Sequence, residues 1–217
     1  MNVRIAYDNE AKEGFRADWG FSCLLETAAG TLLFDTGASA DVLSYNLGQL
    51  GVQSAQIDRI VLSHEHRDHT GGLAAVLHHD AVVYVPQSFT RSVKTAIARE
   101  AELVEISAPH EILPGLHTTG ELGSGIHEQS LVLETRRGVV VVTGCAHPGL
   151  ENVLAAAAGY GELYGVIGGF HGFAKLELLR ELELIAPCHC TARKRAIHAQ
   201  YPEQAVRCGA GTVMELP

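Results

Sequence analysis

The sequence has few aromatic residues, little basic charge and no long hydrophobic run, and each shortage excludes a class of protein. No apolar stretch approaches the roughly 20 residues that a membrane-spanning helix needs, so we expect no membrane partner. Lys and Arg number 16 against 25 Asp and Glu, which gives a formal net charge of −9. This sign disfavours a nucleic-acid partner held by its phosphate backbone. Aromatic residues make up only 6% of the chain, so we expect a core of aliphatic side chains.

The length of the chain indicates a single domain, and its cysteines indicate that the thiols are reduced. The 217 residues are enough for one sizeable core and short of two full domains, so we expect a single domain over residues 1–217. The five cysteines are an odd number, and Cys188 and Cys190 lie too close together for an easy disulfide. The first residues enter a strand-like pattern without the features of a secretory signal. We therefore expect reduced thiols and a cytoplasmic location.

The densest group of chemically active side chains is the segment 63–72, Ser-His-Glu-His-Arg-Asp-His-Thr-Gly-Gly. It follows the apolar run Ile60–Leu62 and precedes a new apolar segment, so we expect a tight loop between a buried strand and a helix. The alternative is a polar surface loop with helix-capping histidines. Imidazole and carboxylate bind zinc, iron or manganese. The candidate ligands are His64, His66, Asp68 and His69.

Four ligands on one loop would crowd a single ion, whereas two neighbouring ions would share them and hold a hydroxide between them. The segment therefore predicts a site for two divalent ions. We expect zinc, and the same ligand types also suit iron or manganese.

These residues resemble the metal motif of the metallo-β-lactamase superfamily, in which the histidines and aspartate are followed by Thr70-Gly71-Gly72. A second match lies upstream, where Thr31–Gly37 resembles a strand ending in Asp-Thr-Gly. The resemblance implies an α/β fold, a four-layer αββα sandwich with the metals along one edge. It also implies that Asp35 orients a metal ligand or its loop. Asp-Thr-Gly is also ordinary turn chemistry, which is the alternative for Asp35.

Three further histidines follow apolar, strand-like runs in glycine-rich or cysteine-containing turns: His147, His171 and His189. If those strands are parallel, the three imidazoles lie at the same edge as the loop of His64. We predict that His64, His66 and His147 hold the first ion and that Asp68, His69 and His189 hold the second. His171 is an additional imidazole that replaces a metal ligand or contacts substrate.

The turns around these histidines resemble one branch of the superfamily. One of the turns also departs from the pattern of many of the superfamily's hydrolases. Gly-Cys-Ala-His-Pro-Gly, Gly-Gly-Phe-His and Cys-His-Cys-Thr resemble a branch that includes the archaeal dihydropterin–ribofuranosylaminobenzene phosphate synthases. Many hydrolases of the superfamily bridge their metals with an aspartate after the strand corresponding to Val139–Val142, where this chain has Cys145. We interpret Cys145 as a small buried residue rather than a ligand. The bridge is then missing or supplied by solvent.

Candidate substrate contacts come from two regions. Residues 9–20 read as a polar loop that contains Trp19. The resemblance implies that this loop overhangs the metals and touches substrate; alternatively, Trp19 anchors the loop on the core. Arg193 and Lys194 begin a basic helix just after His189, and they either lie on a solvated face or attract an anionic substrate. His127, in a long connection over residues 107–128, is a further site candidate.

Three functions stay open at this stage. We expect a hydrolase in which a metal-bound hydroxide attacks a small, anionic, phosphate-containing substrate, with Asp68 holding the nucleophile as well as a metal. The narrower resemblance implies the alternative of a transferase that condenses a dihydropterin diphosphate with an aromatic ribofuranosyl phosphate. The third is a non-catalytic metal-binding sensor. The sequence does not name the substrate or the oligomeric state.

Hydrophobic periodicity predicts helices in six places: 40–50, 73–77, 89–99, 150–158, 174–184 and 191–200. It predicts a hairpin of Leu131–Glu134 with Gly138–Thr143, and one short strand around Ile112–Thr118.

Overall fold

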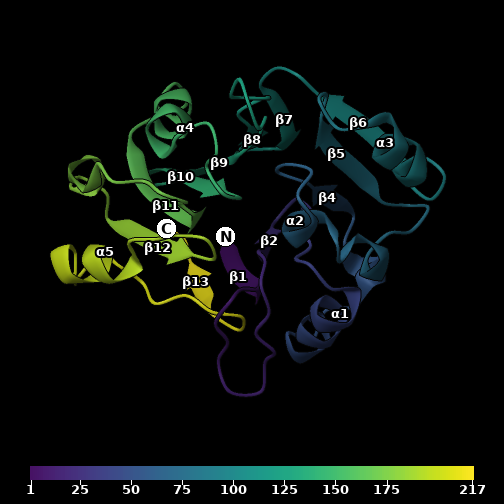
Figure 1. Cartoon of the computed structure of the whole chain (residues 1–217), viewed down its shortest axis with the longest axis horizontal. Coiled ribbons are helices and arrows are strands. Elements are labelled where there is room, and N and C mark those ends of the chain that lie inside the picture. Colours follow the sequence, from purple (N-terminus) through teal and green to yellow (C-terminus); the bar gives the residue numbers. More distant parts are fainter.

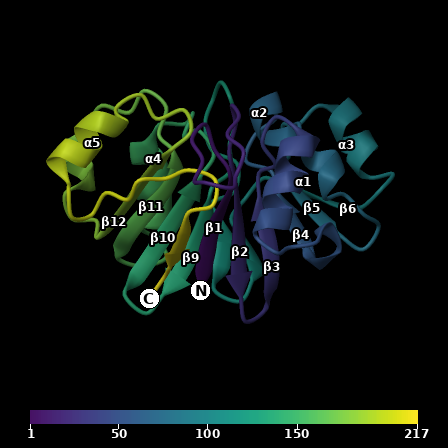
Figure 2. The ribbon, with the colours of Figure 1, turned by 90° about the horizontal axis from the view of Figure 1, so that it is seen from below.

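The computed structural model describes all 217 residues and has four layers, a helical layer on each outer face of two stacked sheets (Figure 1). The helices are α1 (Ala40–Gln49), α2 (Arg67–Thr70), α3 (Arg91–Ile97), α4 (Leu150–Ala157) and α5 (Lys194–Gln200). In Figure 2 the sheets lie between α1 and α3 on one side and α4 and α5 on the other. This confirms the predicted αββα sandwich.

The first sheet has seven strands in the order β13, β1, β2, β3, β4, β5, β6. Their bounds are β1 (Asn2–Tyr7), β2 (Ser22–Thr27), β3 (Gly30–Phe34), β4 (Arg59–Val61), β5 (Val82–Pro86), β6 (Glu102–Ile106) and β13 (Val213–Glu215). Strands β3 to β6 are parallel, whereas β13, β1 and β2 pair antiparallel. The carboxyl ends of β3 and β4 therefore lie at one edge of this sheet.

The second sheet has six strands in the order β12, β11, β10, β9, β8, β7. Their bounds are β7 (His110–Leu113), β8 (Leu116–Thr118), β9 (Leu131–Thr135), β10 (Gly138–Thr143), β11 (Leu163–Gly169) and β12 (Leu184–Cys188). Strands β10, β11 and β12 are parallel, so the turns that follow them share one edge of the sheet.

The strands divide their side chains between two kinds of core. Along β10, Val140 and Val142 face the core between the sheets, whereas Val139 and Val141 face the core beneath α4 and α5. This alternation follows from the two-residue period of a strand. Because both faces of each sheet are covered, the strands read as nearly continuous apolar runs.

One predicted helix is wrong. The segment 174–184 was expected to be helical, but it forms only a 3-10 turn over Leu176–Leu179, and Leu184 already begins β12. The buried residues Leu176, Leu179 and Leu182 are three apart, which matches the three-residue turn of a 3-10 helix better than the 3.6-residue turn of an α-helix.

The other differences are smaller. The single strand expected around Ile112–Thr118 is a hairpin of β7 and β8, because Pro114 and Gly115, with φ of 73° at the glycine, turn the chain. The helix expected over 191–200 begins at Lys194, since Thr191 is bonded to the loops instead: its hydroxyl donates to the Cys188 carbonyl and accepts from the Phe170 N–H. The segment 73–77 holds only a 3-10 turn, Leu73–Ala75.

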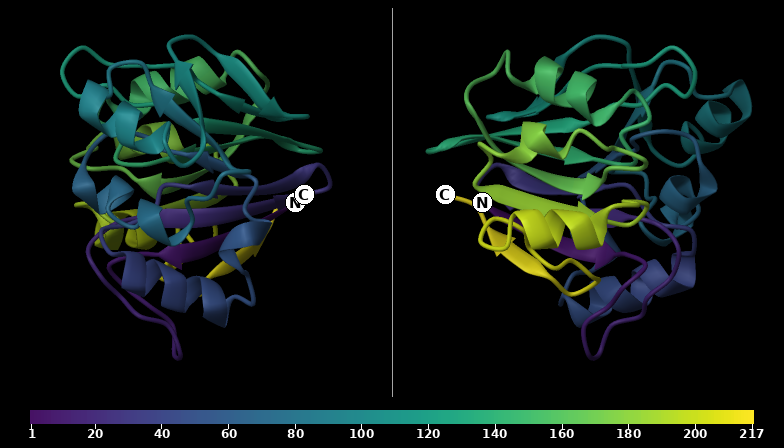
Figure 3. Two further views of the ribbon diagram at one scale, coloured as in Figure 1. Left: turned by 90° about the vertical axis from the view of Figure 1, so that its right-hand side faces the viewer. Right: turned by 60° about the vertical axis from the view of Figure 1, so that its left-hand side comes forward.

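The fold places one short helix and several loops at a common end. The two termini lie side by side, where β1 pairs with β13 (Figure 3). Helix α2, which carries Asp68 and His69, lies at the opposite end of the sandwich from the termini (Figure 2). None of the helices is long and apolar enough to cross a bilayer.

Candidate metal centre

All six predicted ligands gather at that end of the sandwich in two groups. The ligand atoms of His64, His66 and His147 lie within 4.8 Å of one another, and so do those of Asp68, His69 and His189. The residues come from three separate segments: the loop after β4 with helix α2, the loop after β10 and the loop after β12. The structure thus brings together side chains up to 125 positions apart, from His64 to His189.

The first group spans the two sheets. The Nε2 atom of His64 lies 3.1 Å from Nδ1 of His66, and the ring centroids of His64 and His147 are 4.6 Å apart. Close approach of the two loops depends on Gly144, because a Cβ there would lie 2.2 Å from the hydroxyl oxygen of Ser63. His64 is fully buried, whereas His66 is exposed.

The second group is centred on the Asp68 carboxylate. Its Oδ2 atom lies 3.2 Å from Nε2 of His189 and 3.9 Å from Nε2 of His69. Nε2 of His189 is buried and has no hydrogen-bond partner in the protein. A buried imidazole nitrogen without a partner costs free energy unless a further group binds it. A cation between Asp68, His69 and His189 would satisfy that nitrogen.

The two groups contain five histidines, and in four of them the Nδ1 atom lies within hydrogen-bond distance of an oxygen of the protein. The partners are Ser63 Oγ for His64 (2.8 Å), Asp35 Oδ2 for His69 (2.6 Å), Glu128 Oε2 for His147 (3.0 Å) and Asn9 Oδ1 for His189 (2.9 Å). A hydrogen bond at Nδ1 sets the ring orientation and leaves Nε2 free, which is the arrangement found around metal-bound histidines.

Asp35 serves both groups at once. Its Oδ2 accepts hydrogen bonds from His69 and from the Ser63 hydroxyl (2.7 Å), and that hydroxyl oxygen in turn faces His64. Its Oδ1 accepts from the Ser63 backbone N–H at 2.7 Å. Burial raises the pKa of Asp35 to about 8, against the hydrogen bonds from Ser63 that favour the carboxylate. A cation held beyond the His69 ring would favour the ionised form further.

Glu128 is a site residue that the sequence analysis missed. Its side chain is buried, and its two oxygens accept from the backbone N–H groups of Cys145 (2.9 Å), Ala146 (3.0 Å) and His147 (3.0 Å) as well as from the His147 ring. Burial alone would raise the pKa of Glu128, but the bond from His147 and the neighbouring imidazoles hold it well below its usual range. The carboxylate therefore shapes the whole turn after β10.

Burial also sets the protonation of the central imidazoles. It lowers the pKa of both His64 and His69 to about 3, so both rings are neutral at pH 7 and can act as ligands. Burial opposes ionisation of Asp68, but the His189 imidazole, whose Nε2 lies 3.2 Å from Oδ2, holds the pKa of Asp68 below its usual range. The Asp68 carboxylate thus lies beside the neutral ring of His69.

Backbone strain is concentrated in the same loops. The only residues other than glycine with positive φ are Asp35 (56°), Ala146 (56°), His171 (43°) and His189 (44°). Such conformations cost on the order of 1–3 kcal/mol each and persist where the surrounding structure fixes them. Each of the four lies within three residues after the end of β3, β10, β11 or β12.

A family profile decides where this chain belongs. The profile of the metallo-beta-lactamase superfamily matches residues 20–189, which include every candidate ligand. The chain belongs to the metallo-β-lactamase superfamily. This fold implies divalent metal binding, and the His and Asp side chains are positioned for it.

Three individual proteins are similar to this chain over nearly its whole length. The 7,8-dihydropterin-6-methyl-4-(beta-D-ribofuranosyl)-aminobenzene-5'-phosphate synthase of Methanocaldococcus jannaschii is 24% identical over 284 aligned positions, which cover 99% of this chain and 97% of that protein. A solved structure described as a metal-dependent hydrolase of the beta-lactamase superfamily has a TM-score of 0.81 and 25% identity, covering 99% of this chain and 98% of the other. Human tRNase Z, short form, shares the fold alone, with 12% identity, a TM-score of 0.62 and 100% coverage of both chains.

The remaining predicted site residues lie around the two groups. The indole N–H of Trp19 donates to Asp68 Oδ2 at 3.0 Å, and its ring centroid is 4.9 Å from that of His189. Trp19 is 58% exposed, so it covers the second group rather than anchoring the loop in the core. Lys194 lies 3.9 Å from Asp8 and 3.5 Å from Glu10, whereas Arg193 is exposed at the start of α5.

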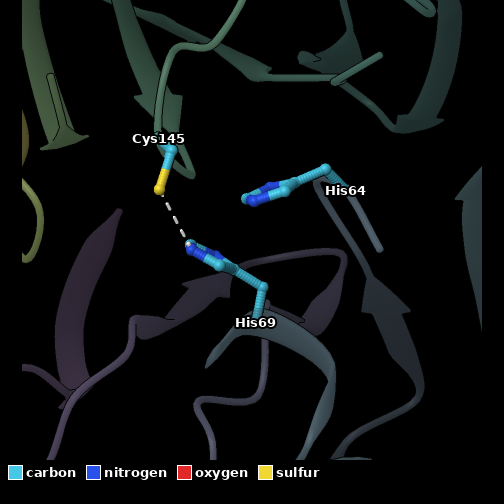
Figure 4. Close-up of side chains that lie close together, drawn as sticks. All are labelled: His64, His69 and Cys145. Carbon is cyan, nitrogen blue, oxygen red and sulfur yellow. Dashed lines mark hydrogen bonds between the residues drawn. The ribbon is translucent and has the colours of Figure 1, made fainter. Parts of the chain in front are cut away.

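Three further residues named from the sequence, His171, His127 and Cys145, lie near the two groups or apart from them. His171 is outside both groups: its ring lies 5.2 Å from that of His147, and it lines an open cavity of about 400 Å³ with Phe170 and Lys175. His127 pairs with Glu121 at 3.0 Å and joins no group. Cys145 is buried as expected, but its sulfur contacts the Nε2 atom of His69 at 3.2 Å rather than apolar side chains only (Figure 4).

Proposed function

We propose that this chain is a metal-dependent hydrolase acting on a small, anionic, phosphate-containing substrate. The observation that carries the proposal is the pair of side-chain groups at one end of the sandwich, in which four imidazoles have Nδ1 fixed by protein oxygens. A site built only to stabilise the fold has a closed set of ligands, whereas here His66 is exposed and the Asp68 side chain is 22% exposed.

We assign two divalent ions, zinc in the first place, to the two groups. His64, His66 and His147 would hold one ion, and Asp68, His69 and His189 the other. The bound ions would supply Lewis-acid chemistry, polarising the group under attack and lowering the pKa of water toward neutrality. Asp35 and Glu128 act as positioning residues, because each is buried and hydrogen-bonds to a candidate ligand.

Asp68 is the residue of the set that is best placed to handle a proton. Its carboxylate is 22% exposed, whereas His69 and His189 beside it are buried. The lowered pKa keeps Asp68 ionised at neutral pH, so Oδ2 can orient water and accept a hydrogen bond from it. Trp19 holds the same oxygen and shields it from bulk solvent.

An anionic substrate is supported by basic groups in an otherwise acidic chain. Lys175 lines the cavity beside His147 and His171, where its amino group pairs with Glu151 at 2.8 Å. A second hollow of about 340 Å³ is lined by Lys194, Arg195, His198 and Arg207. Basic side chains attract phosphate groups, and they would raise the local concentration of an anion against the net charge of −9.

The test is hydrolysis by metal-loaded protein of generic phosphodiester, phosphomonoester and carboxylic ester substrates. The proposal predicts turnover of at least one phosphate ester, abolished by chelator and reduced by about 100-fold or more in Asp68→Asn. A variant at an exposed aspartate outside the site, Asp80→Asn, is the matched control. Absence of turnover at every metal loading contradicts the hydrolase.

A transferase is the second candidate, favoured by the coverage of the M. jannaschii synthase over 99% of this chain. In that reaction the ions held by the same side chains would bind a diphosphate leaving group, and no water would need to attack. Incubation with a dihydropterin diphosphate and an aromatic ribofuranosyl phosphate, followed by product analysis, separates the two. A condensed product with release of pyrophosphate supports the transferase, and hydrolysis of the diphosphate alone supports the hydrolase.

Proposals on the partners and the location of the protein rest on the same reasoning. We propose a small-molecule substrate, no nucleic-acid partner and no membrane partner, and a cytoplasmic location. Measuring retention of the protein on nucleic acid at low salt tests the second of these, since the charge of −9 predicts none.

A further inference from the structure

The sulfur of Cys145 lies between the two groups of candidate ligands. Its Sγ atom is 3.2 Å from Nε2 of His69, the nitrogen left open by Asp35. The ligand atoms of Cys145, His64 and His69 all lie within 4.8 Å of one another, and Cys145 also forms such a group with His189 and Cys190. Figure 4 shows the thiol and the two imidazoles pointing toward one another from opposite sheets. One sulfur thus joins histidines of both groups.

The chain holds that sulfur in place through its backbone. The Cys145 N–H donates to Glu128 Oε1 at 2.9 Å, and Ala146, next along, has a φ of 56° that turns the chain between Cys145 and His147. A residue needed only to fill space in an apolar core would not require a buried carboxylate beneath its amide and strained backbone beside it. The thiol is therefore aimed by the same turn that aims His147.

A second thiol supports the first. The Sγ atom of Cys190 lies 3.2 Å from Sγ of Cys145. This approach depends on Gly169, where a Cβ would lie 2.7 Å from the Cys190 sulfur and 3.3 Å from the Cys145 Cα. Cys190 is only partly buried and lies behind Cys145, farther from His64 and His69. Its S–H group is positioned to donate a hydrogen bond to the Cys145 sulfur.

We propose that Cys145, as a thiolate, is a ligand of the metal centre at the position between the two groups, and that Cys190 donates a hydrogen bond to that sulfur. This inference rests on the proposed metal centre. On metal binding the S–H bond of Cys145 breaks, its electron pair forms the sulfur–metal bond and the proton leaves to solvent. No oxidant is needed, and both cysteines stay reduced.

A sulfur ligand changes which metals the centre selects. With imidazole and carboxylate alone, manganese, iron and zinc all suit the site. A thiolate favours zinc and cobalt over manganese and magnesium, because softer ions bind sulfur more strongly. The centre would therefore discriminate against the hard divalent ions that are abundant in cells.

Cobalt substitution tests the assignment directly. Chelator-treated, reduced protein is titrated with Co²⁺, and the near-ultraviolet band of thiolate-to-cobalt charge transfer is recorded together with the visible cobalt bands. The inference predicts both features in the wild type and loss of the near-ultraviolet band in Cys145→Ser and Cys145→Ala, with the visible bands retained. Cys190→Ser is expected to keep the charge-transfer band with a shifted wavelength. Cys208→Ser, a buried thiol of the core between the sheets, is the matched control and should behave as wild type.

The outcomes separate this inference from the proposed function. Visible cobalt bands without a charge-transfer band in the wild type would leave the metal centre intact and overturn the thiolate ligand. Survival of the charge-transfer band in both Cys145 variants, or its loss in Cys190→Ser alone, would also overturn it. A wild type that takes up no cobalt at all would contradict the metal centre itself. Circular dichroism and the melting temperature of each variant check that it is folded.

Discussion

At the scale of single residues, the candidate centre depends on side-chain oxygens that hydrogen-bond to the candidate ligands. Asp35, Glu128, Ser63 and Asn9 each fix one imidazole, and three of them, Asp35, Glu128 and Asn9, also accept from backbone N–H groups. Partners of this kind set the geometry and basicity of a ligand, and their loss weakens metal affinity by about 10- to 100-fold. Substituting the side chains that fix the ligands thus tests the candidate centre, as substituting the ligands does.

Glu128→Gln is predicted to lower metal affinity at the first group by about 10- to 100-fold. The amide keeps only one acceptor oxygen, and its NH₂ group would face N–H donors of the turn after β10. We also expect a loss of roughly 3 kcal/mol in the free energy of unfolding, because buried donors lose a charged partner. Competition titration with a chromophoric chelator and urea denaturation measure the two effects. Glu134→Gln, on the surface, should change neither, and equal losses in both variants would refute the role of Glu128.

Asp35→Asn is predicted to weaken both groups, whereas Ser63→Ala should weaken mainly the group of His64. The reason is that Asp35 binds His69 directly and reaches His64 only through the Ser63 hydroxyl. Metal content after dialysis against a weak chelator gives the comparison, with about 10-fold lower affinity expected for each ion affected. Identical patterns of loss in the two variants would contradict the division of labour between them.

At the scale of strands and loops, close backbone approach decides whether the two halves of the site can meet. Gly168 in β11 has a φ of 124°, and a Cβ there would lie 1.9 Å from the Thr143 carbonyl oxygen of the neighbouring strand β10. No movement of a side chain relieves a clash with backbone. The carboxyl ends of β10 and β11, and with them the turn of His147, depend on this glycine.

Gly168→Ala is therefore predicted to destabilise the protein by on the order of 3 kcal/mol and to reduce metal uptake. Gly48→Ala in α1 is the control, because its Cβ meets nothing within 4 Å and alanine favours the helix. That control should be neutral or more stable by up to about 1 kcal/mol. Thermal unfolding of both variants supplies the measurement, and a Gly168 variant as stable as the Gly48 variant would be inconsistent with the packing described.

The sequence predicted the candidate metal ligands better than the side chains that hydrogen-bond to those ligands. The loop of His64 to His69 could be predicted because ligands and flanking strand lie within a few residues, and His147 and His189 because each follows an apolar run. Glu128 could not, since its partners Cys145 to His147 are about 17 to 19 positions away and meet it only in the folded state. The helix predicted over 174–184 is wrong, because the buried leucines of this segment lie three residues apart, which suits a 3-10 turn.

At the scale of the whole molecule, the centre links the two sheets. The first group takes His64 and His66 from the loop after β4 and His147 from the loop after β10. A cation bound by residues of both sheets stabilises the folded chain, because the unfolded chain cannot hold those ligands together. We therefore expect metal binding and global stability to be coupled.

Removing metal with a chelator is predicted to lower the melting temperature, and adding zinc back should restore it. At a free zinc concentration 100-fold above the dissociation constant, one site contributes about 2.7 kcal/mol. Calorimetry of the chelator-treated and reconstituted protein measures the shift. His147→Ala, which removes the ligand from the second sheet, should show a smaller zinc-dependent shift than wild type, and an equal shift would contradict coupling through the first group.

The central claim is that imidazoles from separate strand ends hold two divalent ions, and the metal content of the purified protein tests it most directly. Protein prepared without chelator is analysed for all transition metals beside a double variant, His147→Ala with His189→Ala. The account predicts close to two ions per chain, zinc foremost, in the wild type and a clear loss in the variant. A wild type that carries no transition metal and takes none up on reconstitution would contradict it.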